Sequence, residues 1–488
     1  MPDWVSWSAV IGFLLVLAQV GVYVVALGVI PGGRKPSTGM AWLILILAVP
    51  FLGLLFFFLF GSTHVERKRH RTQLEVNRRI HERTAEVADL GATTPELGSV
   101  ATVAVLNRRL GALPAVAGNA VDLFSDYTES IAAMTAAVDE AHSFVHVEFY
   151  IMAWDEVTEP FFAALVRATE RGVPVRLLYD HLGSRGIPVY KDMVRKLEQT
   201  SIQWHPMMPI QLLRGKFRRP DLRNHRKILV VDGTCAFGGS QNLIEPSYDK
   251  PKNQQVGRKW VELTTRLRGP AVAELNAVFL TDWYSETGEL PEETVTSGLH
   301  AGMDGGTTVQ VVPSGPGFTT ENNLRMFTTL IYSAQRRISL TSPYFVPDES
   351  LLYAVTTAAQ RGVDVELFVG EEGDQFMVHH AQCSFYQALL SAGVHIRLYP
   401  APWVLHAKHF TIDDQVAVLG SSNMDLRSFA LNYEVSLMLL GADAVARMRE
   451  VEDSYRAMSR ELSQEEWSQR SRRSRYVDNV MRLTSALQ

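Results

Sequence analysis

The sequence has little cysteine and no strong excess of charge. Of its 488 residues only Cys235 and Cys383 are cysteine, and the formal net charge at pH 7 is -5. Two cysteines cannot form a disulfide framework, so we interpret them as unrelated core residues of a protein in a reducing compartment. The small net charge gives no overall reason to expect a nucleic acid as partner. At 47% hydrophobic residues, the chain can build two domain-sized cores.

A phrase that occurs twice at identical spacing is the most informative feature. Each copy holds His-x-Lys, an Asp after four further residues, and a Gly-Ser-x-Asn tail. The members are His225, Lys227, Asp232, Gly239, Ser240 and Asn242 in the first copy and His406, Lys408, Asp413, Gly420, Ser421 and Asn423 in the second. An isolated His is more often a structural residue than a catalyst. Two matched copies indicate a shared physical cause.

The residues between Lys and Asp are apolar or mixed in both copies, at 228–231 and 409–412. This pattern predicts a buried strand, on which His and Lys, two positions apart, point the same way. The stretch before Gly-Ser predicts a second strand. Each copy is therefore expected to be a hairpin that returns its Ser and Asn to its His and Lys.

Two such hairpins in contact would form a phosphate site. Lys227 and Lys408 would surround the anion together with hydroxyl and amide donors, and stabilise the charge that develops in the transition state. Those donors are Ser240, Asn242, Ser421 and Asn423. One imidazole can attack phosphorus while the other protonates the leaving alkoxide. Neither motif contains a carboxylate cage or a Cys pair, so we predict no metal and no cofactor.

Further segments extend the pattern beyond the motifs. They include Ser342-Pro-Tyr-Phe-Val-Pro347, Leu431-Asn-Tyr-Glu434 and, near the amino terminus, Arg34-Lys-Pro36 followed by Met40-Ala-Trp42. Together with the duplicated motif they resemble the phospholipase D superfamily and, within it, the bacterial cardiolipin synthases. The resemblance covers essentially the whole chain. It implies an α/β fold of two similar lobes with a mixed sheet each, and favours His225 as nucleophile and His406 as general acid.

An attacking imidazole needs a carboxylate at its other ring nitrogen. Glu434 follows Asn423 in an apolar stretch and is the expected partner of His406. Its counterpart is Glu262, for which an insertion at 245–257 makes the spacing differ. The resemblance points to the same two acids. We place Asp232 and Asp413 in the catalytic motif, but prefer for them a structural role, fixing the lysine or the turn.

The amino terminus is predicted to be a membrane anchor, residues 1–61. Residues 10–30 form an apolar run of 21 residues and residues 41–60 one of 20 without a charge, each long enough to cross a bilayer. A cleavable signal peptide fits less well, because a second apolar run follows. The flank after the second run, with Arg67, Lys68 and Arg69, is more basic than the connection with Arg34 and Lys35. The catalytic region and the amino terminus are therefore predicted to be cytoplasmic.

The remaining chain is divided by pattern. Residues 62–98 are charge-dense and predict a juxtamembrane helix or a solvated spacer, and residues 99–300 and 301–488 predict the two lobes. Residues 144–151, 161–171 and 173–179 predict a βαβ unit, as do residues 338–346, 351–361 and 363–369. A glycine-rich joint is expected at 302–306. Helical spacing after residue 470 predicts a carboxyl-terminal amphipathic helix, for which packing on the second lobe is preferred over lying on the membrane.

Two stretches before the motifs suggest a lipid-binding mouth. Residues 206–213 are apolar and precede basic residues from Arg214 to Arg223, and residues 400–405 are apolar. An ordinary surface loop and a DNA-binding tract are the alternatives. With the apolar runs, these stretches predict a membrane cardiolipin synthase that uses phosphatidylglycerol and other anionic phospholipids. A phospholipase D, a transphosphatidylase with another headgroup and a non-catalytic lipid-binding protein remain open, as does the oligomeric state.

Overall fold

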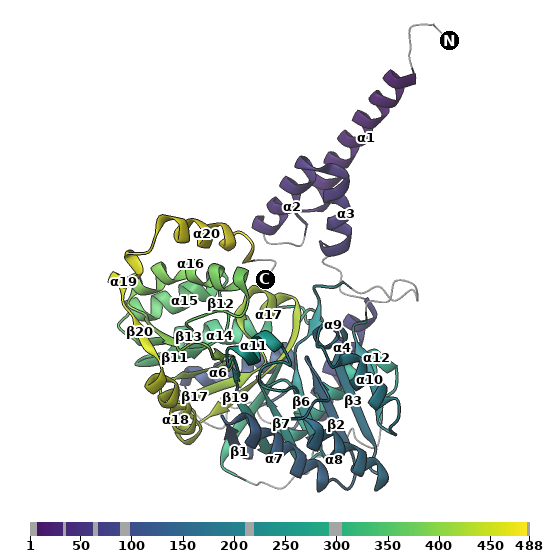
Figure 1. Cartoon of the computed structure of the whole chain (residues 1–488), viewed down its shortest axis with the longest axis vertical. Helices are drawn as coiled ribbons and strands as arrows, with labels where there is room; N and C mark the ends of the chain where they lie inside the picture. Colours follow the sequence, from purple (N-terminus) through teal and green to yellow (C-terminus); the bar gives the residue numbers. More distant parts are fainter. Residues whose placement is uncertain are drawn as a thin grey trace. The chain divides into compact units, whose positions relative to one another are not determined.

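The computed structural model describes residues 7–32, 36–61, 67–87, 98–209, 219–291 and 305–485 (Figure 1). It divides into two compact units. One comprises Met1–Arg67 with Arg219–Asp221, and the other comprises Lys68–Arg218 and Leu222–Gln488. The first unit carries the apolar helices and the second carries both copies of the motif.

The amino-terminal unit contains one helix that is long and apolar enough to span a membrane. Helix α1 covers Trp7–Val29, and its spanning segment is Val10–Val29, 20 residues. This agrees with the first predicted apolar run, because a helix of that length crosses a bilayer core of about 30 Å.

The second predicted span is not a single helix. It forms α2 (Pro36–Ala48) and α3 (Pro50–Phe60), 13 and 11 residues, with Val49 between them in a non-helical conformation. Pro50 causes the break, because proline has no N–H and disfavours helical backbone at the preceding residue. At 1.5 Å per residue the two helices are about 20 Å and 17 Å long, too short to span. The predicted hairpin of two spans is therefore not confirmed. Arg34 and Lys35 lie outside the described residues.

The charged segment after the anchor forms helix α4 (Arg67–Arg83). Its His70 side chain lies 2.9 Å from the backbone oxygen of Gly317, and Ile80 packs against the core of the larger unit. The helical alternative of the sequence prediction is therefore correct, and the helix is attached to the larger unit instead of being a solvated spacer.

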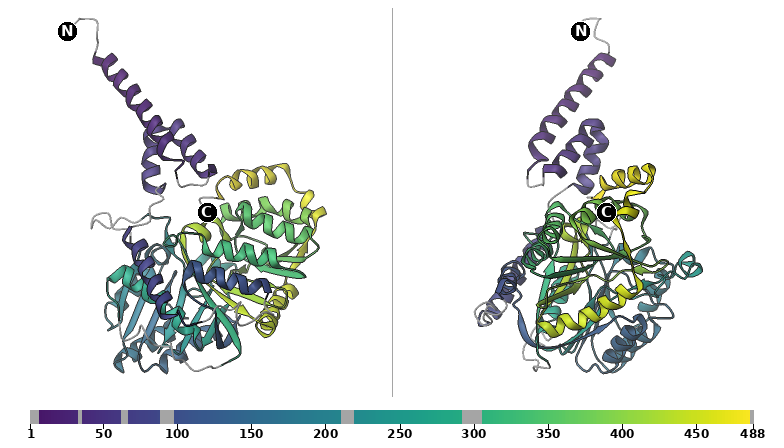
Figure 2. Two further views of the ribbon diagram at one scale, coloured as in Figure 1. Left: turned by 180° about the vertical axis from the view of Figure 1, so that it is seen from behind. Right: turned by 90° about the vertical axis from the view of Figure 1, so that its left-hand side faces the viewer.

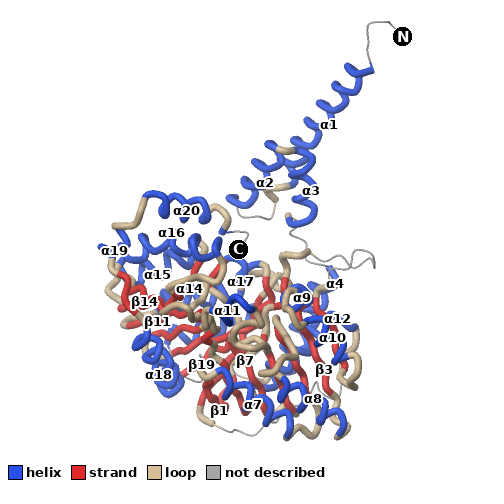
Figure 3. The backbone as a smooth tube through the Cα atoms, viewed as in Figure 1, coloured by secondary structure: helices blue, strands red, loops and turns tan. Residues whose placement is uncertain are grey.

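The larger unit is built on one sixteen-stranded sheet, drawn in red in Figure 3. Its order is β20-β14-β13-β11-β16-β17-β19-β10-β1-β9-β7-β6-β2-β3-β4, with β5 paired to β19. In the first half of the chain the strands are β1 (Val116–Phe124), β2 (Val145–Phe149), β3 (Val175–Asp180), β4 (Gln203–Met207), β5 (Arg223–Asn224), β6 (Lys227–Val231), β7 (Cys235–Gly239) and β9 (Thr264–Arg268). In the second half they are β10 (Thr307–Ser314), β11 (Arg337–Thr341), β13 (Asp364–Gly370), β14 (His395–Tyr399), β16 (His409–Ile412), β17 (Val416–Gly420), β19 (Asn432–Leu440) and β20 (Arg460–Leu462).

The sheet is mixed, as predicted, but the two halves share it. Strand β10 pairs antiparallel with β19 on one edge and with β1 on the other, which joins the halves. The prediction of one sheet per lobe is therefore wrong in this respect. The two βαβ units are confirmed. Strands β2 and β3 are parallel around α8 (Glu159–Glu170), and β11 and β13 are parallel around α15 (Glu349–Gln360). Two short ladders, β12 (Phe345–Val346) with β18 (Met424–Asp425) and β15 (Val404–Leu405) with β8 (Trp260–Val261), lie outside the sheet.

Helices cover the sheet on its outer faces (Figure 2). The longer ones are α7 (Tyr127–Asp139), α10 (Tyr190–Leu197), α12 (Ala271–Thr287), α14 (Asn322–Ser333), α16 (Phe376–Ala392), α18 (Ala442–Met458) and α20 (Arg472–Arg482). The short ones are α9 (His181–Arg185), α11 (Pro251–Gln255), α17 (Leu426–Ala430) and α19 (Gln464–Ser468). Helix α20 packs on α16 and buries Asp478 there, so the preferred packing of the carboxyl-terminal helix is correct.

Apolar clusters tie the halves together. One cluster joins Ile228 and Leu267 of the first half to Leu419 and Leu437 of the second, so strands of both halves share a core. Helix α6 (Gly98–Gly111) was assigned by sequence to the first lobe, but its Val100, packed with residues such as Leu330 and Ile338, lies in the core of the second. Of the glycine-rich joint only Gly305 and Gly306 are described, and Gly305 donates to the backbone of Gly118.

A buried acid in the second half should make stability depend on pH. Burial raises the pKa of Glu452 from 4.5 to about 7, and Thr411 donates to its carboxyl group at 2.9 Å. The protonated form is the one that folding favours, so its stabilisation is full below 4.5 and is lost as pH rises through 7.

We expect Glu452→Gln, which keeps a neutral hydrogen-bond acceptor, to exceed the wild type in stability by an amount that grows from pH 5 to pH 8, up to about 3 kcal/mol. Thermal unfolding across this range measures it. The exposed Glu450→Gln on the same helix is the control and should show no such trend. An equal gap between Glu452→Gln and wild type at every pH would contradict this account.

Candidate active site

The two motif histidines are introduced by short strands that pair with the opposite half. Strand β5 runs parallel to β19, and the His225 N–H donates to the Tyr433 oxygen at 2.8 Å. In the same way β15 runs parallel to β8, and the His406 N–H donates to the Val261 oxygen at 2.8 Å. The backbone of each half therefore fixes the histidine of the other.

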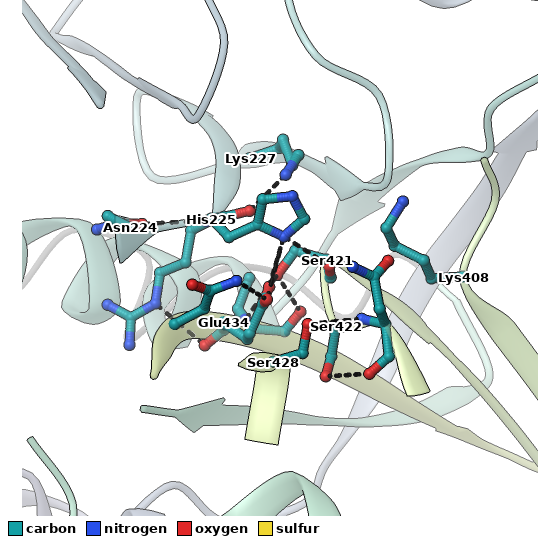
Figure 4. Close-up of polar contacts among 12 residues, drawn as sticks. Asn224, His225, Lys227, Lys408, Ser421, Ser422, Ser428 and Glu434 are labelled. Carbon is teal, nitrogen blue, oxygen red and sulfur yellow. Dashed lines mark hydrogen bonds and ion pairs between the residues drawn. The ribbon is translucent and has the colours of Figure 1, made fainter. Parts of the chain in front are cut away.

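This strand exchange places each histidine against a carboxylate of the other half, and Figure 4 shows the pair of His225 and Glu434. Nδ1 of His225 lies 3.1 Å from both carboxylate oxygens of Glu434 and 3.0 Å from the Ser421 oxygen. Nδ1 of His406 lies 2.7 Å from Glu262 Oε1. The predicted pairing of Glu434 with His406 and of Glu262 with His225 is thus wrong. Strand β5 leads into His225 and pairs with β19 of the second half, and β8 leads into Glu262 and pairs with β15 of the second half. Each glutamate therefore contacts the histidine of the opposite half.

The two motif serines hold these carboxylates. Ser240 Oγ donates to Glu262 at 2.6 Å and accepts the Leu263 N–H at 2.9 Å. Ser421 Oγ donates to Glu434 and accepts the Val435 N–H at 3.0 Å. Their hydroxyl protons are therefore committed to the carboxylates, and phosphate binding by Ser240 and Ser421 stays a prediction.

The glycine before each motif serine is required for steric reasons. A Cβ on Gly239 would lie 2.3 Å from the backbone oxygen of Leu263, and one on Gly420 would lie 2.3 Å from that of Val435. Only glycine lets the motif strand approach the strand that carries the glutamate this closely.

The two motif asparagines differ. Asn242 donates to the Tyr248 hydroxyl at 2.7 Å and accepts the Ile151 N–H at 3.2 Å, so both ends of its amide are engaged. Asn423 Oδ1 is buried without a hydrogen-bond partner among the described residues. Phosphate binding by both asparagines stays a prediction, and Asn423 is the one whose amide is less committed.

The two motif lysines are buried and arranged alike. Lys227 Nζ donates to the His225 oxygen and Lys408 Nζ to the His406 oxygen, each at 2.5 Å. Burial lowers the pKa of Lys227 to about 7 and that of Lys408 to about 8. Each ammonium has three protons, so two remain for an anion. A bound phosphate would favour the charged form of both.

The histidines are held as neutral rings. Burial, followed by the charges of Lys227 and Lys408, holds the pKa of His225 well below its usual value, and burial also lowers that of His406. The charge of His406 also acts to lower the pKa of His225. With Nδ1 directed to a carboxylate, Nε2 is the nitrogen available for chemistry in each ring.

The two carboxylates differ in charge. Burial raises the pKa of Glu434 to about 7, against the opposing charge of Lys227. At Glu262 burial acts to raise the pKa as well, but His406 and Lys408 outweigh it and hold the pKa below its usual value. Glu262 is therefore the more strongly ionised of the two.

Asp232 and Asp413 lie at the far ends of the motif strands. Asp232 accepts backbone N–H groups from His142, Ser143 and Phe144, and Asp413 accepts three from residues 335–337. Both have positive φ, 53° and 48°. The preferred structural role, fixing the turn, is correct, and their place in the catalytic set is not supported by this geometry.

Comparison with known proteins places this arrangement. The family model described as "Cardiolipin synthase, PLD-like domain" matches residues 134–283 and 327–454, and the model described as "Phospholipase_D-nuclease N-terminal" matches residues 21–62. The chain is 32% identical to cardiolipin synthase A of Edwardsiella ictaluri over 99% of its length and 98% of that protein, and 32% identical to cardiolipin synthase A of Pectobacterium carotovorum over the same shares. The chain belongs to the cardiolipin synthase family.

A solved structure supports the same fold. The chain is similar to phosphatidylserine synthase of Haemophilus influenzae with a TM-score of 0.60 and 15% identity, over 79% of this chain and 99% of that protein. At this identity the likeness shows the fold alone, an α/β architecture of phospholipase D type. The resemblance to the bacterial cardiolipin synthases, which the motifs indicated, is confirmed.

The lipid mouth predicted for this cardiolipin synthase family member is described only in part, and several of its described residues are buried. Val404 and Leu405 are buried in β15, and Met207 is buried in a core cluster. Arg223 is buried and pairs with Asp180 at 3.3 Å, so it does not line a mouth. Residues 210–218, which hold Arg214, Lys216 and Arg218, lie outside the described residues.

Sequence reasoning missed two aromatic residues of the site. The ring of Tyr150 meets that of His225 at a centroid distance of 4.7 Å, and the ring of Tyr344 meets that of His406 at 6.4 Å. Each tyrosine closely follows the first strand of a βαβ unit, β2 or β11. An alignment of the two halves on these strands would have found the pair.

The exchange of carboxylates predicts how the two acids act. Glu262→Gln and Glu434→Gln should each lower turnover of a nitrophenyl phosphodiester by about 10²- to 10⁴-fold, because an amide can neither fix the Nδ1 proton nor stabilise a charged ring. Glu262→Gln should also shift the pH profile downward, since that carboxylate raises the pKa of His406.

The control is Glu274→Gln. Glu274 is buried outside the site, and burial raises its pKa well above the usual value, so an amide replaces a neutral acid there. It should retain the wild-type rate. Wild-type turnover in either Glu262→Gln or Glu434→Gln would refute the assignment.

Proposed function

We propose that this protein is a cardiolipin synthase that transfers a phosphatidyl group from one phosphatidylglycerol to a hydroxyl of another, releasing glycerol. The observation that carries this is the pair of crossed His–Glu contacts with a lysine beside each, in a chain matching the family over nearly its whole length. Two positioned imidazoles suit an acid–base pair acting on a phosphodiester, which a lipid-binding module does not need.

In the first step, His225 Nε2 attacks phosphorus and the bond from phosphorus to the glycerol oxygen breaks. The bound phosphodiester anion and the ionised Glu262 favour the charged form of His406. Charged His406 gives its Nε2 proton to that oxygen, so glycerol leaves neutral and a phosphatidyl-histidine remains. The resemblance favours His225 as nucleophile, and the carboxylates support it. The histidine that must carry a proton faces Glu262, the more strongly ionised acid.

In the second step, a hydroxyl of another phosphatidylglycerol attacks the same phosphorus and the P–N bond breaks. His406 Nε2 takes the hydroxyl proton and is ready for the next cycle. Lys227 and Lys408 neutralise the charge that builds up on the phosphoryl oxygens in both steps. The chemistry needs no group beyond these side chains.

The membrane arrangement is also a proposal. Helix α1 crosses the bilayer, and the catalytic unit faces the cytoplasm, because the basic residues at 34–35 and 67–71 follow α1 in the sequence, whereas residues 1–6 before it contain no Lys or Arg. Anionic phosphatidylglycerol in the cytoplasmic leaflet is then accessible to the site. A cysteine placed near residue 430 should react with a membrane-impermeant maleimide in inside-out membrane vesicles but not in intact cells. This result would support the orientation.

Incubation of the purified full chain with phosphatidylglycerol, without nucleotide, tests the activity. We expect cardiolipin and glycerol in equal amounts. Phosphatidic acid as sole product would support a phospholipase D instead, and no product would refute both.

His225→Ala and His406→Ala should each lower cardiolipin formation by at least about 10³-fold, because each removes one partner of the acid–base pair. The surface variant His142→Ala is the control and should keep the wild-type rate. With a nitrophenyl donor, whose leaving group needs no acid, His406→Ala should still form a labelled phosphohistidine and His225→Ala should not. The reverse pattern would exchange the two roles.

A further inference from the structure

A polar pocket lies beside the second motif histidine. It is a depression open to solvent, whose empty space of about 300 Å³ includes the solvent at its mouth, and its lining includes Tyr344, Asp374, Gln375, His379 and Leu405. These residues come from the segment after β11, from the loop between β13 and α16, and from β15. The two steps of the proposed mechanism leave this pocket without a role.

The pocket adjoins the reacting ring. Leu405 is bonded to His406 in the chain, and the Tyr344 ring presents its edge to the His406 ring at a centroid distance of 6.4 Å. A group held in the pocket is therefore next to the histidine that handles the proton of the leaving and entering alcohols.

The polar groups of the pocket form one connected set. The Tyr344 hydroxyl lies 3.0 Å from both carboxylate oxygens of Asp374 and donates to them, and Gln375 Nε2 donates to that hydroxyl at 2.9 Å. The Asp374 oxygens keep lone pairs for further donors, because a carboxylate accepts about four hydrogen bonds. The pocket therefore offers acceptors to a ligand.

Its charge excludes a phosphate. Among the described residues, the lining contains the carboxyl groups of Asp374 and Glu372 and no Lys or Arg, and Glu372 is paired with Arg258 at 3.3 Å at the rim. Phosphate binds where cations gather, which is at Lys227 and Lys408. Uncharged hydroxyl groups, which donate to carboxylates, fit the pocket instead.

The first half has no counterpart. The residue at the end of its corresponding strand, β3, is Asp180, which is fully buried, accepts the Gly183 N–H as cap of α9, and pairs with Arg223. Its carboxylate is committed to the protein. In the part of the chain that the structure describes, the His225 side therefore has no carboxylate at this strand end that is left to accept from a ligand hydroxyl.

We propose that this pocket is the diol subsite, which binds the glycerol hydroxyls of the departing headgroup in the first step and of the accepting phosphatidylglycerol in the second. Asp374 accepts a hydrogen bond from the hydroxyl that does not react and so turns the reacting one toward phosphorus and His406 Nε2. Asp374 is a positioning residue, with Tyr344 as its support. The naming of phosphatidylglycerol rests on the proposed function, whereas the preference for a vicinal diol rests on the pocket.

Free glycerol is the probe. The full-length protein in detergent micelles is given phosphatidyl-p-nitrophenol, so that nitrophenol release reports formation of the phosphohistidine and needs no diol. Phosphatidylglycerol formed at increasing glycerol concentration gives the KM for the acceptor. Asp374→Asn should raise this KM at least about tenfold while lowering nitrophenol release far less, since an amide is a weaker acceptor than a carboxylate.

Matched variants separate positioning from folding. Asp364→Asn, at the opposite and exposed end of the same strand β13, should keep the wild-type KM for glycerol. Tyr344→Phe should raise the KM in the same direction, because Asp374 loses the hydroxyl that orients it.

Three results would overturn the subsite. One is an equal loss of nitrophenol release and glycerol transfer in Asp374→Asn, which indicates a structural role. Another is an unchanged KM for glycerol. The third is wild-type preference for ethanolamine over glycerol at equal concentration, which indicates a cation site. If Asp374 governs glycerol transfer but the wild type makes no cardiolipin from phosphatidylglycerol, the subsite stands and the proposed function fails.

Discussion

The site depends on one interaction, the contact of each motif histidine with a glutamate of the opposite half. Both glutamates are buried, and both histidines are less than a tenth exposed. Loss of one partner would leave the other buried and uncompensated, a cost of about 3–5 kcal/mol for each broken pair. The parallel ladders β5–β19 and β15–β8, the shared apolar core and the continuous sheet all hold the halves in this position.

The duplicated halves are not equivalent around their histidines. Beside His225 lies a buried polar group in which Arg226 pairs with Asp282, and Asn224 also donates to Asp282 at 2.9 Å. Beside His406 the corresponding residues are the apolar Leu405 and Ala407. This difference accompanies the different charge of the two glutamates and the Asp374 pocket beside His406. The symmetric motif thus supports two unequal chemical roles.

Local features were predictable from the sequence and contacts between halves were not. The hairpins and the βαβ units follow from alternating apolar residues, which neighbours in the chain determine. The partner of Glu434 follows from β5 and β8, two-residue strands without a periodic signal. Ser240 and Ser421 were assigned to phosphate because a hydroxyl is as suitable for a phosphate as for a carboxylate. Pro50 marks the break in the second apolar run, but a prediction from apolar composition alone does not take the proline into account.

Helix α6 also bears on how the chain is made. Its residues precede the whole first half in the sequence, yet Val100 and Val103 complete a core formed by residues from 312 to 467. During synthesis this helix leaves the ribosome long before that core exists. Its apolar face therefore remains exposed to water or bound to a chaperone while the strands of the first half pair. The half that is made last then closes over this early helix, so assembly is completed only near termination.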